Sequence, residues 1–520
     1  MDFFSEFTMR SLGLMSSLLV VCLGGVFLAV LVMFVADVCQ TRDAIRRNYP
    51  VIGRFRALFS TLGEFFRQYF FAMDREEMPF NRAEREWVYR SAAGTDNTVA
   101  FGSTKNLSPV GSTIFVNCPY PMLDEETGPA PAVTLGPYCR MPYEAQSIIN
   151  ISGMSFGAIS RPAVQALSRG AKLANCWLNT GEGGLSPYHL EGGADIVFQI
   201  GTAKYGVRDA DGRLSDDKLR EVAAHEQVRM FEIKLSQGAK PGKGGILPAI
   251  KVTREIAKIR GIPVGQSSIS PNRFPDVNSN GDLLDFIGHV REVTGKPTGI
   301  KCVLGAYGWL DELCDEIHRR GIESAPDFIA IDSGDGGSGA APMPLMDNVG
   351  LLIRQALPMV VDILYRQGLR DRIKIIAAGK LITPADVAWA YCAGADFVTS
   401  ARGFMFSLGC IQAMKCNKNT CPTGITTHDR RLQRGLDPTD KAERVKNFVG
   451  KIRYGVGIIA HSCGAQHPRA LKRYHVRMVQ ADGNSTPLDE LFPYPQSRGE
   501  PIASARSRAH SSEVPQGFSG

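Results

Sequence analysis

Three closely spaced cysteines carry the clearest chemistry of this chain. Cys410, Cys416 and Cys421 fall within twelve residues, and Pro422 follows the last of them. Clustered thiolates are soft ligands that suit iron–sulfur clusters. Zinc is an alternative, but its sites take four ligands in paired short spacings, so His428 would have to be the fourth. Structural thiols are another alternative. We predict an iron–sulfur cluster on the three cysteines, and with it electron transfer.

The elements that must position these thiols form a repeating pattern from about residue 147 onward. Short apolar runs alternate with helical stretches, which predicts an α/β fold of the (β/α)8 barrel (TIM barrel) type. A doubly wound open sheet is the alternative, but no Gly-x-Gly-x-x-Gly follows the first strand. The predicted strands are Ser147–Ile151, Cys176–Leu178, Met230–Lys234, Val264–Ile269, Gly299–Val303, Phe328–Asp332, Ile373–Ala377 and Phe397–Thr399.

Glycine-rich sequences follow several of these strands, where barrels gather their functional residues. They cover residues 153–160, 179–184, 234–245 and 332–339. Glycine lets the backbone approach a planar or phosphorylated ligand closely, and loop N–H groups can donate to it. A single such loop could be only a flexible turn, but several on one face favour a cofactor site. The candidate contacts in these loops are Ser155, Thr180, Gly336 and Gly337.

Two further loops suit a phosphate group. Gly379 follows the seventh predicted strand, and Ser400, Arg402 and Gly403 follow the eighth, where barrels commonly bind phosphate. Arg402 would add a bidentate clamp, with a surface ion pair as the alternative. Lys301 ends an apolar strand and would stabilise charge on a reduced flavin, unless it only reaches toward solvent.

Residues 147–430 resemble the central FMN-binding synthase domain of glutamate synthase. The shared motifs occur in the same order: Asn-Thr-Gly-Glu-Gly-Gly, Gln-Gly-Ala-Lys-Pro-Gly-x-Gly-Gly, Ile-Ser-Pro, Gly-Asp-Gly-Gly-Ser-Gly-Ala and Cys-x5-Cys-x4-Cys-Pro. The resemblance implies FMN in the barrel mouth and a [3Fe–4S] cluster on the three cysteines. It also implies reductive conversion of 2-oxoglutarate and ammonia, through 2-iminoglutarate, to L-glutamate.

The same resemblance implies roles for single residues. Lys234, Lys240 and Arg260 match the family's contacts to the two carboxylates of 2-oxoglutarate. Glu182 matches an acidic residue near FMN, as a proton donor or a gate, and capping of a glycine-rich turn is its structural alternative. Glu182 and Lys301 are thus the candidate catalytic residues.

Some features depart from the family pattern. Ile246 stands where the family has Gln, which removes an expected polar contact with the substrate. We find no glutaminase domain and no NAD(P)H-binding unit, and expect ammonia from a separate glutaminase and electrons from a ferredoxin or a reductase subunit. Two alternatives stay open: an FMN-barrel oxidoreductase for another oxo or imino acid, and a non-catalytic membrane module.

The N-terminal region predicts a membrane anchor. Residues 11–36 carry no charge and are long enough to span a bilayer. A cleaved signal peptide is the alternative, but the preceding residues are not basic. An amphipathic helix follows at residues 51–70, and either the lipid interface or the globular body can cover it. The basic residues after the run predict a cytoplasmic body by the positive-inside rule; they are Arg42, Arg46, Arg47, Arg54 and Arg56.

Bulk composition narrows the remaining classes. The 59 Lys and Arg are dispersed among 52 Asp and Glu, so the net charge of +7 does not indicate a nucleic-acid partner. Twelve irregularly spaced cysteines do not form a secreted disulfide framework, so we expect reduced thiols. The expected organisation is an anchor at 1–45, an amphipathic helix and irregular region at 46–146, the barrel at 147–430, a helical extension at 431–497 and a disordered tail at 498–520.

Overall fold

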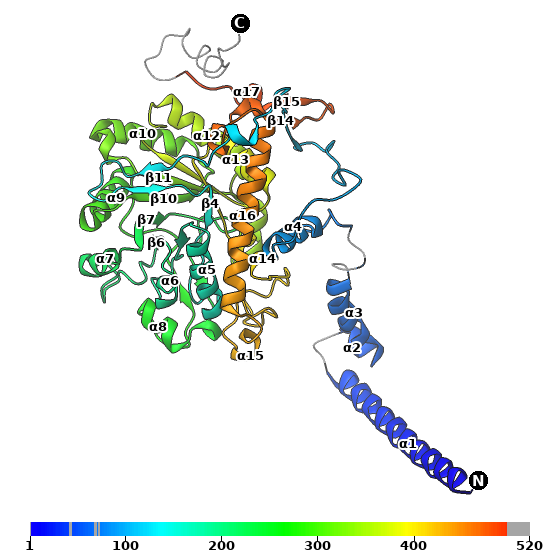
Figure 1. Cartoon of the computed structure of the whole chain (residues 1–520). Coiled ribbons are helices and arrows are strands. Elements are labelled where there is room, and N and C mark those ends of the chain that lie inside the picture. Colours follow the sequence, from blue (N-terminus) through cyan, green and yellow to red (C-terminus); the bar gives the residue numbers. More distant parts are fainter. Residues whose placement is uncertain (1, 41–43, 67–69, 71–72, 497–520) are drawn as a thin grey trace. The chain divides into compact units, whose positions relative to one another are not determined.

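The computed structural model describes residues 2–40, 44–66, 70 and 73–496 (Figure 1). Two of the regions considered above, Arg42 and residues 498–520, lie outside the described residues. The chain divides into two compact units, Met1–Ala83 and Glu84–Gly520. The larger unit holds every candidate site residue.

Eight parallel strands close into a barrel, which confirms the predicted fold class (Figure 1). Closure occurs between the last and the first strand, where Ser400 lies opposite Ile151. Because all strands run in the same direction, their carboxyl ends meet on one face. The strands are β4 (Ile149–Ile151), β5 (Leu178–Asn179), β6 (Ile196–Ile200), β7 (Val228–Lys234), β10 (Thr298–Val303), β11 (Phe328–Asp332), β12 (Lys374–Ala378) and β13 (Phe397–Ser400).

One predicted barrel strand is wrong. Within Val264–Ile269, only Ser268–Ile269 is extended, and it forms β9, which pairs antiparallel with β8 (Ile246–Leu247) outside the barrel. Val264 and Ile269 are both exposed, so this run does not supply a buried strand. The strand that takes its place is β6, which is buried along its whole length. It follows β5 after only a four-residue helix, α6 (Pro187–Leu190), so the usual strand-to-strand spacing was absent.

Helices surround the barrel, and several begin at the caps that their sequences encode. The side chain of Ser160 accepts from Ala163 N at the start of α5, and Thr383 accepts from Asp386 N at the start of α13. The other helices that follow the strands are placed similarly around the ring. These helices are α5 (Arg161–Leu173), α7 (Asp216–Ala223), α8 (Arg254–Arg260), α9 (Asn280–Thr294), α10 (Gly308–Arg320), α11 (Met343–Asn348), α12 (Ile353–Arg366), α13 (Pro384–Cys392) and α14 (Arg402–Ser407).

A hairpin closes the amino-terminal end of the barrel. Its strands are β2 (Val133–Leu135) and β3 (Tyr143–Ala145). Leu135 and Tyr143 join a buried cluster with Trp177 and Phe397, which lie where strands begin. Burial of these large side chains is a main source of stability for the barrel. The opposite face stays open for a ligand.

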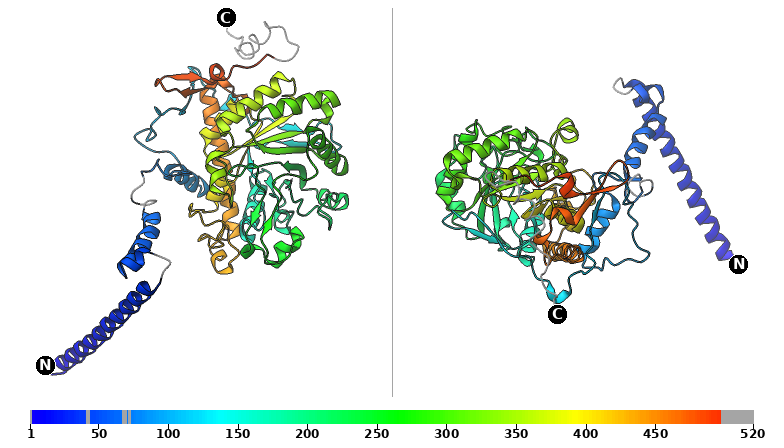
Figure 2. Two further views of the ribbon diagram at one scale, coloured as in Figure 1. Left: turned by 180° about the vertical axis from the view of Figure 1, so that it is seen from behind. Right: turned by 90° about the horizontal axis from the view of Figure 1, so that it is seen from above.

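The segment after the barrel is not purely helical. After the short α15 (Arg430–Gln433), the long α16 (Pro438–Ser462) runs along one side of the barrel (Figures 1 and 2). Two strands follow, β14 (Val476–Val479) and β15 (Ser485–Pro487), and then α17 (Leu488–Leu491). β14 pairs with β1 (Thr113–Phe115), so residues before and after the barrel share one small sheet. α4 (Arg82–Ala92) precedes this sheet in the chain.

The smaller unit contains α1 (Asp2–Cys39), α2 (Ala44–Asn48) and α3 (Ile52–Phe66). Phe7–Cys39 is long and apolar enough to cross a membrane, and an 18-residue stretch within it has a mean hydropathy of 3.1. Near its end, the buried carboxylate of Asp37 pairs with Arg46 and Arg54 at 2.7 Å each. These ion pairs fasten α2 and α3 to the end of α1.

The packing of α5 against α16 generates a stability prediction. A Cβ at Gly170 would lie 2.5 Å from Val445 Cβ, so Gly170→Ala should lower the free energy of unfolding by about 1–3 kcal/mol through overpacking. Gly288→Ala in α9 is the matched control, because no heavy atom lies within 4 Å of its added Cβ. We expect that change to stabilise by about 0.5–1 kcal/mol. Denaturant titration of both variants measures the difference, and equal shifts would contradict it.

Candidate functional site

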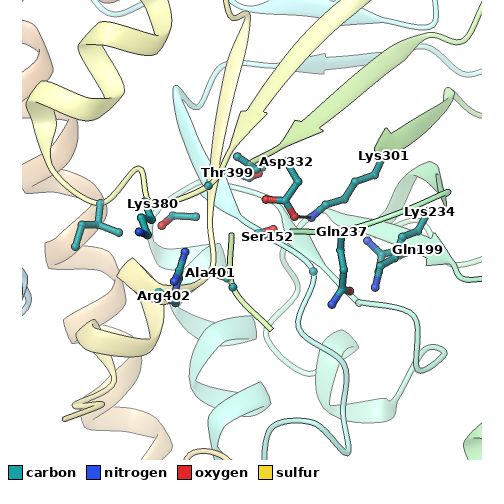
Figure 3. Close-up of a pocket in the computed structure, with 16 residues that line it drawn as sticks. Ser152, Gln199, Lys234, Gln237, Lys301, Asp332, Lys380, Thr399, Ala401 and Arg402 are labelled. Atoms are coloured by element: carbon teal, nitrogen blue, oxygen red, sulfur yellow. Dashed lines mark ion pairs between the residues drawn. The ribbon is translucent and has the colours of Figure 1, made fainter. Parts of the chain in front are cut away.

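A pocket opens at the carboxyl ends of the barrel strands (Figure 3). Its walls include the basic side chains of Lys234, Lys301, Lys380 and Arg402, but only one carboxylate, that of Asp332. Concentrated positive charge in a concave site attracts and binds anions. The pocket therefore suits a ligand that carries phosphate or carboxylate groups.

Lys301 and Asp332 form a buried ion pair at the centre of this pocket. The Nζ atom of Lys301, from β10, lies 3.3 Å from Oδ2 of Asp332, at the end of the neighbouring β11 (Figure 3). Burial opposes the charge, but Asp332 and Glu232 outweigh it and raise the pKa of Lys301. Asp332 also accepts a hydrogen bond of 3.1 Å from Gly238 N. The lysine is thus a fixed cation, held by its carboxylate.

One end of the pocket is built from tight backbone turns. Gly379 has a φ of +114°, and a Cβ there would lie 2.2 Å from Ser333 Cβ, so only glycine fits. Next to it, Lys380 Nζ lies 2.8 Å from Asp335 Oδ2, and Arg402 Nη2 donates to Asp335 O at 3.2 Å. Burial lowers the pKa of Arg402. The predicted Gly337, Gly379, Ser400 and Arg402 all line this pocket.

A second group of charges surrounds Glu182, in the loop after β5. Its carboxylate lies 3.1 Å from Lys234 Nζ. Burial raises the pKa of Glu182, but Lys234 and Lys240 outweigh it, so the pKa is lowered and the group is ionised at neutral pH. Burial, together with repulsion from Lys234, lowers the pKa of Lys240 to about 8. A Cβ on Gly245 would lie 2.2 Å from Glu182 Oε1, so this glycine makes room for the carboxylate.

Several predicted residues are engaged outside the pocket lining. The buried guanidinium of Arg260 donates to the hydroxyls of Ser155 and Ser268 at 3.3 Å each, and so holds the loop after β4. The Thr180 hydroxyl donates to Gly181 O at 2.9 Å. A Cβ on Gly403 would lie 2.9 Å from Ser400 Oγ, and one on Gly336 would lie 2.7 Å from Asp332 Oδ1. These positions shape the loops that form the pocket.

The sequence alone did not find Gln199, which lines the pocket from β6. Its Nε2 atom donates to Glu232 Oε1 at 2.6 Å, and Asn179 Nδ2 donates to the same oxygen at 2.9 Å. Gln199 was missed because its strand was missed. The signal was present as the apolar run Ile-Val-Phe-Gln-Ile at 196–200.

The three cysteines lie in the loop between α14 and α15. Cys410 and Cys416 are half-buried and Cys421 is buried. Each thiol lies within electrostatic reach of the others, and burial raises the pKa of Cys410 to about 12. Burial would also raise the pKa of Cys421, but hydrogen bonds from Thr423 and Thr426 outweigh it and lower the pKa.

The donor set fits a thiolate-bound cluster in its chemistry, since the three thiols gather in one loop. The pKa of Cys421 is lowered, whereas burial raises the pKa of Cys416 as it does that of Cys410. In the part of the chain that the structure describes, no three Cys, His, Asp or Glu side chains already stand in metal-binding geometry. His428 Nε2 lies 2.8 Å from Gly157 O, so that nitrogen faces the barrel loop. Nearby, Lys251 is buried, which lowers its pKa to about 8.

Comparison with known proteins identifies the family. Residues 123–466 match the protein family described as "Conserved region in glutamate synthase". The chain belongs to this family. It is 39% identical over 499 residues to the glutamate synthase large subunit-like protein YerD of Bacillus subtilis, covering 88% of the chain and 94% of the relative. It is 35% identical over 303 residues to the archaeal-type glutamate synthase [NADPH] of Thermotoga maritima, covering 58% of the chain but only 56% of that relative.

Ile246 is a position where the sequence departs from the pattern expected of the glutamate synthase family. This residue is half-buried in β8 and pairs with Ile269. It directly follows Gly245, whose backbone packs against the Glu182 carboxylate. Ile246, where the resemblance predicts Gln, therefore directly follows a residue that packs against the Glu182 carboxylate.

Proposed function

We propose that this protein is an FMN- and iron–sulfur-dependent oxidoreductase of the glutamate synthase type. In the proposed reaction, 2-oxoglutarate and ammonia lose water to give 2-iminoglutarate, and a hydride and a proton then give L-glutamate. The observation that carries this proposal is the pocket at the strand ends, where four cations face one carboxylate. Such a site suits both the phosphate of FMN and a dicarboxylate substrate.

The residues of the pocket fit FMN. Gly379, Ser400 and Arg402 would hold its phosphate, because the glycine leaves space and the arginine supplies paired donors. Lys301 would face the reducible edge of the ring system, where its fixed charge stabilises negative charge. Bound FMN would supply hydride transfer, and a [3Fe–4S] cluster on Cys410, Cys416 and Cys421 would supply electrons singly.

The substrate would lie against the group of charges around Glu182. Lys234 and Lys240 would bind its carboxylates, and Arg260 would act through the loop that it holds with Ser155. Glu182 is ionised at neutral pH because of the nearby lysines. A carboxylate in this state accepts a proton, and it also occupies the lysines until a substrate carboxylate arrives. We therefore assign Glu182 a gating role at these cations.

Electrons and ammonia would come from separate proteins in this proposal. The electron donor would be a ferredoxin or an NAD(P)H-dependent reductase subunit, and the ammonia source a glutaminase. A second candidate function, favoured by Ile246, is action on another oxo or imino acid, since an apolar side chain there cannot bond a polar substrate group. A non-catalytic membrane module is the remaining alternative.

Spectra and turnover measurements on the anaerobically purified protein test the proposal. Optical and EPR spectra should show flavin bands and a cluster, and dithionite-reduced enzyme should form glutamate from 2-oxoglutarate and ammonia. A loaded enzyme that makes no glutamate, but aminates a different 2-oxo acid, would establish the second candidate. Protein purified without flavin bands would support the non-catalytic alternative.

Lys240 generates a pH prediction. Because its pKa is about 8, its ammonium binds the substrate carboxylate below that pH and is lost above it. The dissociation constant of 2-oxoglutarate should therefore rise as pH increases from 7 to 9.5. Lys240→Met should weaken binding about tenfold or more at pH 7 and remove this pH dependence. Lys243→Met, an exposed lysine of the same loop, is the control and should behave as wild type. Calorimetric titration of wild type and both variants at several pH values measures these dissociation constants.

We also propose that α1 anchors the protein in a membrane as a single span. Its length and apolar composition support this, and the basic residues Arg46, Arg47 and Arg54 after it favour a cytoplasmic catalytic body by the positive-inside rule. The full-length chain should resist extraction from membranes by alkaline carbonate, and a chain lacking residues 1–45 should not. Mass spectrometry showing cleavage after the apolar run would instead identify a signal peptide.

A further inference from the structure

Lys251 connects the barrel mouth to the cysteine segment. It ends a short 3-10 turn (Ala249–Lys251) and its side chain is buried. Its Nζ atom donates to Ala158 O at 2.6 Å and to Cys416 O at 3.3 Å. The first oxygen belongs to the loop after β4, and the second to a predicted cluster ligand. One ammonium group thus bonds both sides of the boundary between the two segments.

The positive charge of Lys251 has no carboxylate partner among the residues that the structure describes. The titratable groups that influence it are the thiols of Cys416 and Cys421 and another cation, Arg260. Two carbonyl oxygens use two of its three N–H donors but do not neutralise its charge. A buried cation is costly unless an anion stands near it. The thiols of the cysteine segment are the groups near Lys251 that can supply such an anion.

Neutral contacts already hold the same boundary together. Ser160 N donates to Ile425 O at 2.8 Å, and His428 Nε2 lies 2.8 Å from Gly157 O. A further neutral donor would be enough if Lys251 served only to hold the two segments. What distinguishes Lys251 from these contacts is its buried charge.

We propose that Lys251 is the counter-charge of the cluster bound by Cys410, Cys416 and Cys421 and raises its reduction potential. This inference rests on the proposed function, because it requires that cluster. Thiolate ligands would make a bound cluster anionic, and one added electron would make it more negative. The reduced form is the more negative one, so a nearby buried cation stabilises it more than the oxidised form. Lys251 is accordingly a positioning residue that acts on the electron carrier.

The test compares charge with hydrogen bonding at position 251 in the full-length, cluster-loaded protein at pH 7. EPR-monitored redox titration gives the midpoint potential for wild type and for Lys251→Arg, Lys251→Gln and Lys251→Met. We expect the Met and Gln variants to shift the equilibrium about tenfold toward the oxidised cluster, which is about 59 mV for a one-electron couple. Lys251→Arg should remain near wild type. Lys258→Met, an exposed lysine in α8, makes the same change in net charge and should leave the potential unchanged.

Each outcome decides the inference. An unchanged potential in the Met and Gln variants with the cluster intact would overturn it, while leaving the proposed reaction in place. If variants lose the cluster, iron and sulfide content shows which of them retain it. Cluster retention in Lys251→Arg but not in the neutral variants supports a charge role. Cluster retention in Lys251→Gln but not in Lys251→Arg overturns the inference. Wild-type protein that forms no cluster would overturn the inference and the cluster assignment together.

Discussion

The ion pair between Lys301 and Asp332 is the contact on which the arrangement of the barrel mouth depends. It joins β10 to the end of β11, and Asp332 also accepts a hydrogen bond from Gly238 in the loop after β7. Several cations in one small pocket repel one another, so each needs a carboxylate partner that holds it in position. The structure repeats the same solution at Lys380 with Asp335 and at Lys234 with Glu182. Each of these cations is thus held by a neighbouring carboxylate, while the lining of the pocket keeps more cations than carboxylates.

This arrangement explains which parts of the fold the sequence predicts. Strands that carry a chemically distinctive residue, such as Lys301 within β10 and Asp332 at the end of β11, stand out as short apolar runs followed by polar or glycine-rich loops. β6 lacks a full helix before it and carries Gln199 in its apolar run, so local pattern was insufficient. Val264–Ile269 has a strand-like composition but lies in the segment between β7 and β10, outside the barrel. Its tertiary surroundings, and not its β propensity, decide its structure.

Some residues of the candidate site are likewise predictable from the sequence, and others are not. Backbone-determined contacts, such as Gly379 at its positive φ, are predictable because only glycine fits the turn. Long side chains are less so, because their direction depends on partners far away in the sequence. Arg260 illustrates this: it comes from a helix after β7 and bonds Ser155 after β4, 105 residues away. The family resemblance predicts a ligand contact for Arg260, and the structure adds the contact with this loop, which the sequence did not predict.

The contacts of the cysteine segment bear on how electrons would reach the barrel. The segment follows α14 directly, the helix that begins at Arg402, so the thiols and the end of the pocket at Arg402 are joined by a short stretch of chain. Ser160, His428 and Lys251 fix it to the loop after β4, and Tyr89 in α4 donates to Cys410 O at 2.6 Å. Contacts on both sides thus hold the cysteine segment in place against the barrel. A cluster bound there, as proposed, would keep a constant separation from the pocket, which electron transfer between two centres requires.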